Sequence, residues 1–492
     1  MYFIGIDLGT SSVKTLLMDE NGAIIHVASR SYDVCYPREG WSEQSPEDWY
    51  NSSLDAIREL IAGIDPGKVK GISCAGQMHG LVVLDETDRV IRPAILWNDG
   101  RAEAEASYLN REIGADVIAA NTGNIAFAGF TAPKILWMRK NEPENYRRIR
   151  RIMLPKDYLV YRLTGTFVTD VSDASGMLLY DVEKRCWSER MMEICGISKV
   201  QLAAVHESCD VVGKIKPEIA ADLGFGEVRV AAGAGDNAGA SVGTGVVREG
   251  QCMISLGTSG TIFIPLNAFR ADESHSIHSF CDTNGKYHLL ACMLTAASCG
   301  KWWIEDILGT TDYNEEMAAF SPDATNSVYF LPYLMGERSP HNNADARGVF
   351  FGMSMSTTRG QMTQAVYEGV CFGLRDSMVV AKGLGISFDS VRLCGGGAKS
   401  RLLCQMVADI MNLPVELTQI EEGPSFGAAI IAAVGCGVYK DVCDAADQLI
   451  RVREIYRPDP NRVATYNRRY AFFRTLYPQN KELFEKLTGG VL

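Results

Sequence analysis

The 492-residue sequence has no apolar run long enough to cross a membrane and no export signal. Its longest apolar run, around Ala428 to Val438, falls well short of the ~20 residues that a spanning helix needs. The N-terminus, Met-Tyr-Phe-Ile-Gly-Ile-Asp, lacks the basic region, apolar stretch and cleavage site of a secretory leader. We therefore expect a cytoplasmic protein with no membrane partner.

Positive charge is also scarce. Lysine and arginine number 48 against 60 aspartate and glutamate, a formal net charge of −12. Nucleic-acid-binding proteins usually present a basic face, so we expect no nucleic-acid partner. ATP stays possible, because backbone N–H groups and a bound cation can hold phosphates. The 14 cysteines contain no CxxC pair, and in a chain of this size they are typical of reduced, mostly buried thiols.

Three familiar motifs are missing. No Gly-x-x-x-x-Gly-Lys-Ser/Thr loop occurs, which excludes the P-loop NTPases. The triple glycine at 395–397 lacks the Gly-x-Gly-x-x-Gly spacing of a dinucleotide site. The one Gly-x-Ser-x-Gly match, Gly239-Ala-Ser-Val-Gly243, falls inside the helix expected from Asp236, so no nucleophile elbow is present at a strand end and nothing supports covalent hydrolysis.

A Gly-Thr-Ser turn is present twice. Residues 2–7 form an apolar strand that ends in Asp7, followed by Leu8-Gly-Thr-Ser-Ser12 and by further strands, 13–18 and from Ala23, across an Asn-Gly hairpin. Near residue 255 the same order returns, Ser255-Leu-Gly-Thr-Ser-Gly260 before a strand. Coincidence between two glycine-rich turns is the alternative. Because flanking pattern and sequence agree, we favour two similar domains over a solenoid, whose period would be ~20–50 residues.

Strands alternate with helices elsewhere, which predicts an α/β architecture. A strand over 228–235 precedes a helix that starts at Asp236, and a strand over 391–394 precedes a helix over 402–411. Another helix begins near Gly423. The expected domains are 1–246 and 247–492.

The Gly-Thr-Ser turns are candidate phosphate sites, because glycine lets the backbone approach an anion and exposes N–H groups to it. Asp7 beside such a turn would repel phosphate unless a cation lay between them, so Mg²⁺ is implied. A simple turn cap is the other interpretation of Asp7. Lys14 is either a phosphate contact or an exposed strand lysine.

Asp236 is the candidate general base. It follows a strand and an all-small Gly-Ala-Gly approach, at the strand-end position where open α/β sheets bind ligands. Phosphoryl transfer to a hydroxyl needs a carboxylate to accept the proton of the alcohol. Capping of the following helix is the alternative, and the two roles are compatible.

Two loops combine groups that suit a sugar. Gly76-Gln-Met-His-Gly80 follows the strand 69–75, and Trp97-Asn-Asp-Gly-Arg101 joins an aromatic face to polar side chains. Taken singly, each is as consistent with an ordinary loop, and His79 alone with a structural histidine.

At this level of detail the chain resembles the FGGY carbohydrate kinases. Gly129 to Asn141 is similar to one signature of that family, and Gly348 to Gly352 with Gln361 to Gly369 to the second. Four shorter segments resemble its xylulokinase branch: Gln77–Gly80, Trp97–Arg101, Leu154–Tyr158 and Gly336–Arg338. The resemblance implies an actin-like (ribonuclease-H-like) fold with two duplicated domains around a deep cleft, and phosphorylation of D-xylulose on O5 by ATP and Mg²⁺.

The resemblance also implies residue roles. Asp236 would be the general base and Asp7 its catalytic partner, both beside the metal. Sugar contacts would be Met78 and His79, with Trp97, Asp99 and Asn237 nearby. Nucleotide contacts would be Thr10, Lys14, Thr258, Gly396, Gly397 and Trp302. A homodimer is also suggested.

Two alternatives remain open. Another kinase of the same family, acting on ribulose, gluconate, fuculose or glycerol, would share fold and chemistry and differ only in its sugar loops. An actin-like ATPase without a metabolic product would share the paired turns but would need no sugar pocket.

Overall fold

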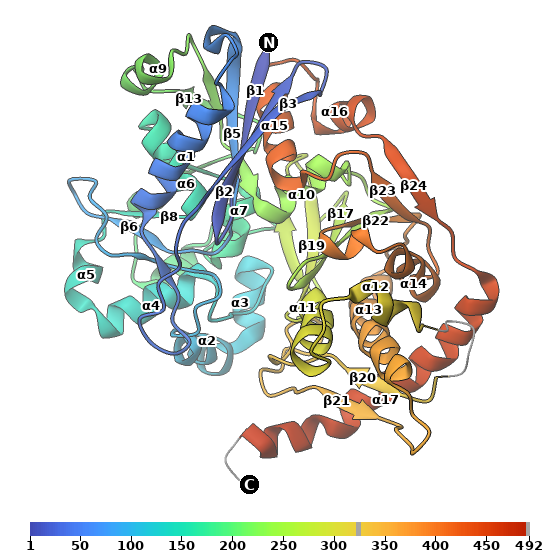
Figure 1. The fold of residues 1–492 in the computed structure, drawn as a ribbon. Helices are drawn as coiled ribbons and strands as arrows, with labels where there is room; N and C mark the ends of the chain where they lie inside the picture. Colours follow the sequence, from blue (N-terminus) through green and yellow to red (C-terminus); the bar gives the residue numbers. More distant parts are fainter. Residues whose placement is uncertain (321–325, 489–492) are drawn as a thin grey trace.

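The computed structural model describes residues 1–320 and 326–488. Two seven-stranded sheets with their helices lie side by side, the first drawn from blue to green and the second from yellow-green to red (Figure 1). The first sheet has the order β13 (Val211–Lys214), β14 (Arg229–Ala231), β5 (Val69–Gly76), β1 (Tyr2–Leu8), β2 (Ser12–Asp19) and β3 (Ile24–Ser31), with β15 (Ala234–Gly235) also paired to β5.

The second sheet repeats this topology. Its order is β18 (His278–Cys281), β19 (Tyr287–Met293), β17 (Gly260–Leu266), β16 (Gln251–Leu256), β22 (Ser390–Cys394), β23 (Val415–Thr418) and β24 (Val452–Tyr456). In β3-β2-β1-β5-β14 and in β19-β17-β16-β22-β23 alike, two antiparallel pairings are followed by two parallel ones. The predicted duplication and the predicted α/β, actin-like fold are confirmed.

The first strand shows why these segments are strands. Ile4, Ile6 and Leu8 belong to a core cluster with Trp49 of α1 (Pro46–Leu60), whereas Phe3 belongs to a different cluster, with Phe426 of α15 (Gly423–Gly435). Alternate side chains of a strand point to opposite faces, so β1 is apolar on both because helices cover both.

The two halves are joined by a close crossing of helices. Helix α15 lies on the first sheet, and it crosses α10 (Asp236–Thr244). A Cβ on Gly427 would stand 1.8 Å from the Gly239 carbonyl oxygen, and one on Gly243 would stand 2.0 Å from that of Gly423. Only glycine allows the backbones to approach this closely. The domain boundary at 246/247 stays a prediction, since a helix from beyond it covers the first sheet.

The single strand predicted over 228–235 is wrong. Gly233 has φ +90°, and a Cβ there would stand 2.2 Å from the Cys74 carbonyl oxygen. The left-handed residue breaks the segment into β14 and β15. The second piece thereby lies beside the end of β5, which fixes where Asp236 begins α10.

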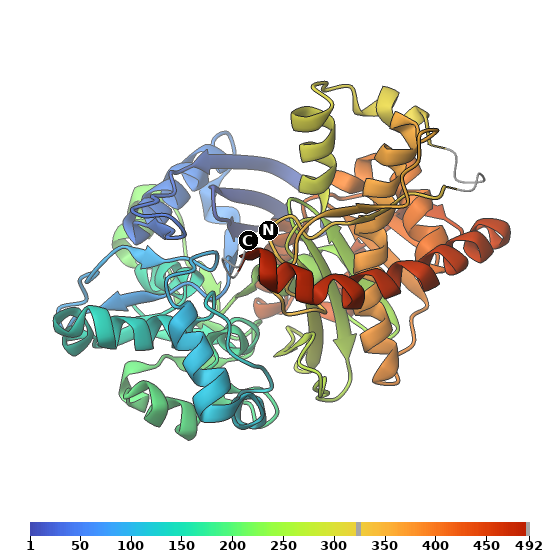
Figure 2. The same ribbon diagram turned by 90° about the horizontal axis from the view of Figure 1, so that it is seen from below.

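The remaining elements surround the sheets. Helices are α2 (Glu103–Tyr108), α3 (Ala115–Thr122), α4 (Thr131–Asn141), α5 (Pro143–Arg148), α6 (Pro155–Thr164), α7 (Val171–Ala174), α8 (Glu189–Cys195), α9 (Pro217–Leu223), α11 (Ala297–Lys301), α12 (Tyr313–Ala318), α13 (Arg359–Gly383), α14 (Arg401–Met411), α16 (Val442–Leu449) and α17 (Pro460–Thr488). Short strands are β4 (Glu43–Gln44), β6 (Val82–Leu84), β7 (Ala94–Ile95), β8 (Arg151–Met153), β9 (Val168–Asp170), β10 (Tyr180–Asp181), β11 (Cys186–Trp187), β12 (Ala204–His206), β20 (Tyr329–Leu331) and β21 (Val349–Phe351). Seen from below, α17 runs as a long red helix across the second domain (Figure 2). Within the described residues, no helix combines the length and apolar character needed to cross a membrane.

Candidate active site

Two aspartates come together at one edge of the first sheet. Strands β1 and β15 both run parallel to β5, with Asp7 in register with Ala75, and Gly235 in register with Gly76. The carboxyl ends of these strands therefore meet at the same edge, where open α/β sheets bind ligands. The structure brings Asp7 and Asp236 together there.

Both carboxyls hold their protons more tightly than usual. Burial, the negative charge of Asp236 and that of Glu422 raise the pKa of Asp7 to about 7, against the opposing effect of Lys14. Burial raises the pKa of Asp236 to about 6, although the backbone and side-chain N–H groups of Asn237 donate to its Oδ1 at 2.7 and 2.8 Å. Two carboxylates in this relation repel each other, so the pair is suited to a cation.

Lys14 is the cross-strand neighbour of Asp7 in the β1–β2 ladder. Its Nζ donates to Oε2 of Glu422 at 2.8 Å, and Glu422 immediately precedes α15. The predicted phosphate contact thus has an acidic partner that the sequence analysis missed. Glu422 stands 408 positions away in sequence, and no local pattern links it to Lys14.

The loop after β5 holds His79 in one orientation. His79 has φ +68°, and its carbonyl oxygen accepts hydrogen bonds from Thr131 Oγ1 at 3.1 Å and from the buried Lys134 Nζ at 2.9 Å. Its Nδ1 lies 2.7 Å from the carbonyl oxygen of Gly176, while burial lowers the pKa of the imidazole to about 3. The ring is therefore neutral, and with Nδ1–H donating to that carbonyl its Nε2 is left as an acceptor.

Met78 and Trp97 join this loop to the aspartate edge. A Cβ on Gly235 would stand 2.9 Å from Met78 Sδ, so Met78 packs directly on the residue before Asp236. Trp97 Nε1 donates to Thr10 Oγ1 at 3.0 Å, and Thr10 Oγ1 donates to Gln77 Oε1 at 3.2 Å. The first Gly-Thr-Ser turn and the predicted sugar loop are therefore one connected unit.

Asp99 has a different environment from the one expected. Its Oδ1 accepts from Arg101 Nε at 2.8 Å, its Oδ2 from Arg101 Nη2 at 2.7 Å, and Oδ2 also accepts from the backbone N–H of Ser42. Both side chains of this fork are wholly buried. A buried carboxylate needs such a charged partner, and Arg101 supplies it; the place of Asp99 near the sugar stays a prediction.

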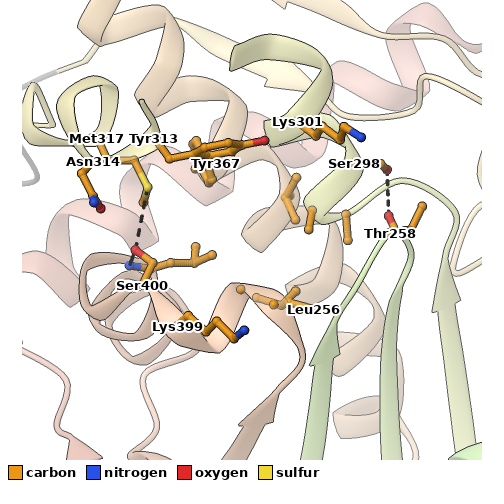
Figure 3. Close-up of a pocket in the computed structure, with 16 residues that line it drawn as sticks. Leu256, Thr258, Ser298, Lys301, Tyr313, Asn314, Met317, Tyr367, Lys399 and Ser400 are labelled. Carbon is orange, nitrogen blue, oxygen red and sulfur yellow. Dashed lines mark hydrogen bonds between the residues drawn. The ribbon is translucent and has the colours of Figure 1, made fainter. Parts of the chain in front are cut away.

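A cavity of about 520 Å³ lies in the second domain (Figure 3). Three predicted nucleotide contacts, Thr258, Gly396 and Gly397, line it. Six larger residues that also line it were not predicted from the sequence: Leu256, Tyr313, Met317, Tyr367, Val370 and Leu403. Figure 3 shows Tyr313, Met317 and Tyr367 along one side, with Leu256 and Lys399 opposite.

Trp302 is not among the lining residues. Its ring lies on Phe330, with centroids 6.0 Å apart and planes 17° from parallel. The other nucleotide contacts predicted in the second domain, Thr258, Gly396 and Gly397, all line the cavity. Trp303, next to Trp302, is buried, and donates from Nε1 to Thr363 Oγ1 at 2.9 Å.

The second turn connects the cavity to the aspartates. Thr258 lies at the cavity, and its carbonyl oxygen accepts from Ser298 Oγ at 2.7 Å. Three residues on, Thr261 Oγ1 donates to Asn237 Oδ1 at 3.2 Å, and Asn237 follows Asp236. The second turn and the strand that follows it therefore link the cavity to the neighbour of Asp236.

Comparison with known proteins gives consistent matches over the whole chain. The model of the FGGY family of carbohydrate kinases, N-terminal domain, matches residues 2–243, and that of its C-terminal domain matches residues 252–436. The chain is 41% identical to the xylulose kinase of Escherichia coli (strain K12), covering 97% of this chain and 99% of that one, and 39% identical to that of Klebsiella pneumoniae over 98% and 99%.

Solved structures agree with these matches. A xylulose kinase from Brucella ovis superposes with a TM-score of 0.93 at 36% identity, covering 98% of this chain and 100% of that one. A gluconate kinase from Lactobacillus acidophilus superposes with a TM-score of 0.95 at 26% identity, covering 99% of both.

Proposed function

Because the chain belongs to the FGGY family of carbohydrate kinases, and is a sugar phosphotransferase, we propose that it phosphorylates D-xylulose on O5 with ATP. The observation that carries the proposal is the Asp7–Asp236 pair beside the Gln77–His79 loop. Asn237, next to Asp236, is bonded to Thr261 of the strand that follows the second turn. Full-length similarity to several xylulose kinases supports the choice of sugar.

Asp236 is proposed as the general base. A base must be ionised in the resting enzyme and must gain affinity for a proton as the hydroxyl attacks, and a carboxyl with its pKa raised to about 6 meets both conditions near neutral pH. One oxygen, Oδ1, is occupied by Asn237. Oδ2 is then left to accept the proton of the attacking sugar hydroxyl.

Met78 and His79 are proposed to hold the sugar. His79 Nε2 presents one fixed acceptor for a hydroxyl, since the other ring nitrogen and the carbonyl oxygen are already bonded. Met78 supplies an apolar contact beside it. This combination of one acceptor and one apolar surface suits a neutral polyol chain.

ATP and Mg²⁺ fit the remaining groups. The cavity walls are apolar where a base and ribose would lie and end at a backbone turn that can receive phosphate. No group of three or more His, Cys, Asp or Glu that could hold a metal is found among residues 1–320 and 326–488. One or two carboxylates, completed by water and substrate phosphates, are the usual ligands of Mg²⁺, and Asp7 and Asp236 would supply them. Bound there, Mg²⁺ neutralises phosphate charge.

Gluconate is a second candidate substrate. Arg338 from the second domain comes within 3.6 Å (Nη2) of where a Cβ on Gly129 would stand, and its charge acts on His79. A guanidinium at the sugar end would suit a substrate that carries a carboxylate. The similarity to a gluconate kinase makes this worth testing directly.

The test is a substrate panel. ATP-dependent phosphorylation of D-xylulose, ribulose, gluconate, fuculose and glycerol is measured, and kcat/KM is compared. We expect D-xylulose to give the highest value. A higher value on any other sugar would overturn the substrate assignment while leaving the sugar-kinase activity intact.

Asp236→Ala tests the base. We expect turnover to fall by at least ~100-fold, as is typical for loss of a general base, with unchanged thermal melting. Thr244→Ala, at the far end of the same helix, serves as the control for α10 itself. Near-normal turnover in Asp236→Ala would contradict the assigned role.

Location and assembly belong to the same proposal. All 14 cysteines are free thiols, which is typical of a reducing compartment and supports the cytoplasm. A homodimer is proposed from family resemblance alone, and sedimentation of the full chain checks it.

A further inference from the structure

A buried charged cluster lies beneath the aspartate edge, outside the groups that the proposed chemistry uses. Lys156 of α6 has no exposed surface, and its Nζ lies 2.7 Å from Asp157 Oδ1, 3.0 Å from Asp170 Oδ1 and 3.9 Å from Asp173 Oδ2. Its Nζ also donates to the carbonyl oxygen of Ala232 at 3.3 Å. Three acids around one lysine form an expensive arrangement in a protein interior, which calls for a reason.

Hydrogen bonds lead from this cluster to the residue before Asp236. Asp170 Oδ2 accepts from Ser172 Oγ at 2.6 Å and from the Ser172 backbone N–H at 2.9 Å. Ser172 Oγ in turn accepts from the backbone N–H of Gly235 at 3.0 Å. Because Ser172 donates its only hydroxyl proton to Asp170, its oxygen is aimed to receive the Gly235 N–H.

The Gly235–Asp236 peptide needs such a support. The segment that leads into Asp236 is Gly-Ala-Gly, whose backbone has wide conformational freedom. Among the described residues, the hydrogen bonds to the Asp236 carboxylate come from its own neighbour, Asn237, and so fix it only relative to the local backbone. Met78 packs on Gly235 from the sugar side, and Ser172 bonds to it from the cluster.

We propose that Ser172 and Asp170 are positioning residues, which hold the Gly235–Asp236 peptide against the Lys156 cluster so that the base faces the sugar hydroxyl. The inference rests on the proposed function, in which Asp236 is the base. A carboxylate displaced by about 1 Å from its reactive geometry can cost up to 10²-fold in rate. The cluster thus contributes to turnover and not to substrate binding.

The chain supplies a matched control. Ser208 is also fully buried, and its Oγ donates to the same Asp170 Oδ2 at 2.9 Å, but it is Ser172 Oγ that accepts the Gly235 N–H. Ser172→Ala and Ser208→Ala therefore each remove one serine hydroxyl bond to Asp170. Only the first also removes the bond to Gly235.

We expect Ser172→Ala to lower kcat at least tenfold while KM for ATP, whose cavity is in the second domain, changes less than twofold. Ser208→Ala should keep kcat within twofold of the parent. Hydrogen exchange of the Gly235 amide should accelerate in the first variant only. Equal kcat in the two variants, or equal exchange at Gly235, would overturn the inference.

Repeating the Ser172→Ala substitution in the Asp236→Ala variant separates this inference from the proposed function. In Asp236→Ala, adding Ser172→Ala should leave the residual rate unchanged, because residues that act through one group are not additive. A further tenfold loss there would overturn the positioning role. High activity of Asp236→Ala by itself would instead contradict the base, whatever the serine variants do. If Ser172→Ala does not fold, Ser172→Cys replaces it. The thiol forms weaker hydrogen bonds, so we expect an intermediate kcat and an intermediate exchange rate of the Gly235 amide. Parental values of both would contradict the proposal.

Discussion

The pH dependence of the reaction follows from the two carboxyls at the sheet edge. Asp7 and Asp236 have pKa values near 7 and 6, and because they interact, these values describe the pair. If both must be ionised to hold the metal and accept the proton, the active fraction falls with the square of proton concentration below pH 6. Between pH 8 and pH 5 the rate should then drop by roughly 10³-fold.

Two carboxyls with ordinary pKa values would give a very different drop in rate. Two aspartates at the ordinary value of 3.8 would lose only about a tenth of their doubly ionised form at pH 5. The doubly ionised fraction at pH 5 thus differs by more than two orders of magnitude between the perturbed pair and an ordinary pair.

The assay uses both substrates far below their KM values, because that rate reports the free enzyme. Sugar phosphate is quantified by ion-exchange chromatography of quenched samples, so that no coupling enzyme limits the rate at low pH. Circular dichroism at each pH checks that the chain is folded. A rate at pH 5 within twofold of that at pH 8, in folded protein, would refute the reasoning. With both substrates saturating, the acid limb should move to lower pH, because a bound cation favours the ionised pair.

Two further substitutions test the same edge. Asp7→Asn should abolish turnover and yet raise Tm at pH 8 by a few °C. The pKa of Asp7 is raised from 3.8 to about 7 in the folded protein, so ionising this carboxyl above pH 3.8 lowers the stability of the fold, by ~1.4 kcal/mol for each pKa unit. Calorimetry should show a smaller gain at pH 5, where folded Asp7 is protonated, and an equal gain at both pH values would contradict the shift. Glu422→Gln frees Lys14 and removes a negative charge near the phosphates, so KM for ATP should fall several-fold at low salt and approach the parental value at high salt. Lys14→Met is the matched variant, and it should raise KM for ATP at low salt. If Glu422→Gln leaves the low-salt KM unchanged, Lys14 does not face phosphate.

Local patterns were sufficient for the strands that carry the site. The expected strand 2–7 is found as β1, and the expected helix from Asp236 is found as α10. Both could be predicted because the pattern that indicates each one, an apolar run for the strand and an acid after small residues for the helix, lies within a single segment. The repeated Gly-Thr-Ser turn predicted the duplication correctly, and the two sheets share their strand order. The two turns do differ by one residue: Leu8 pairs with Val13, whereas Leu256 pairs with Gly260.

What the sequence could not supply is which distant residues meet. Glu422 reaches Lys14 only because α15 lies on the first sheet, and Tyr313 and Tyr367 meet at the cavity from two separate helices. Trp302 and Asp99 sit in segments of the expected kind, but the sequence did not show that Phe330 and Arg101 engage their side chains. Their places at the nucleotide and the sugar stay predictions.

The position of Asp236 depends on both halves of the molecule. On the first-sheet side, Gly235 pairs with β5 and donates to Ser172. On the second-sheet side, Asn237 accepts from Thr261 of β17, and further along α10 the Thr244 carbonyl oxygen accepts from Arg392 of β22. Asp236 therefore stands where the backbone passes from one sheet to the other. A rearrangement between the halves would have to be accommodated at the glycine crossing of α10 and α15. It would change the relation of Asp236 to the second turn, while Ser172 keeps Gly235 fixed to the Lys156 cluster. In this arrangement the same short segment carries the carboxylate proposed as the base and joins the two domains.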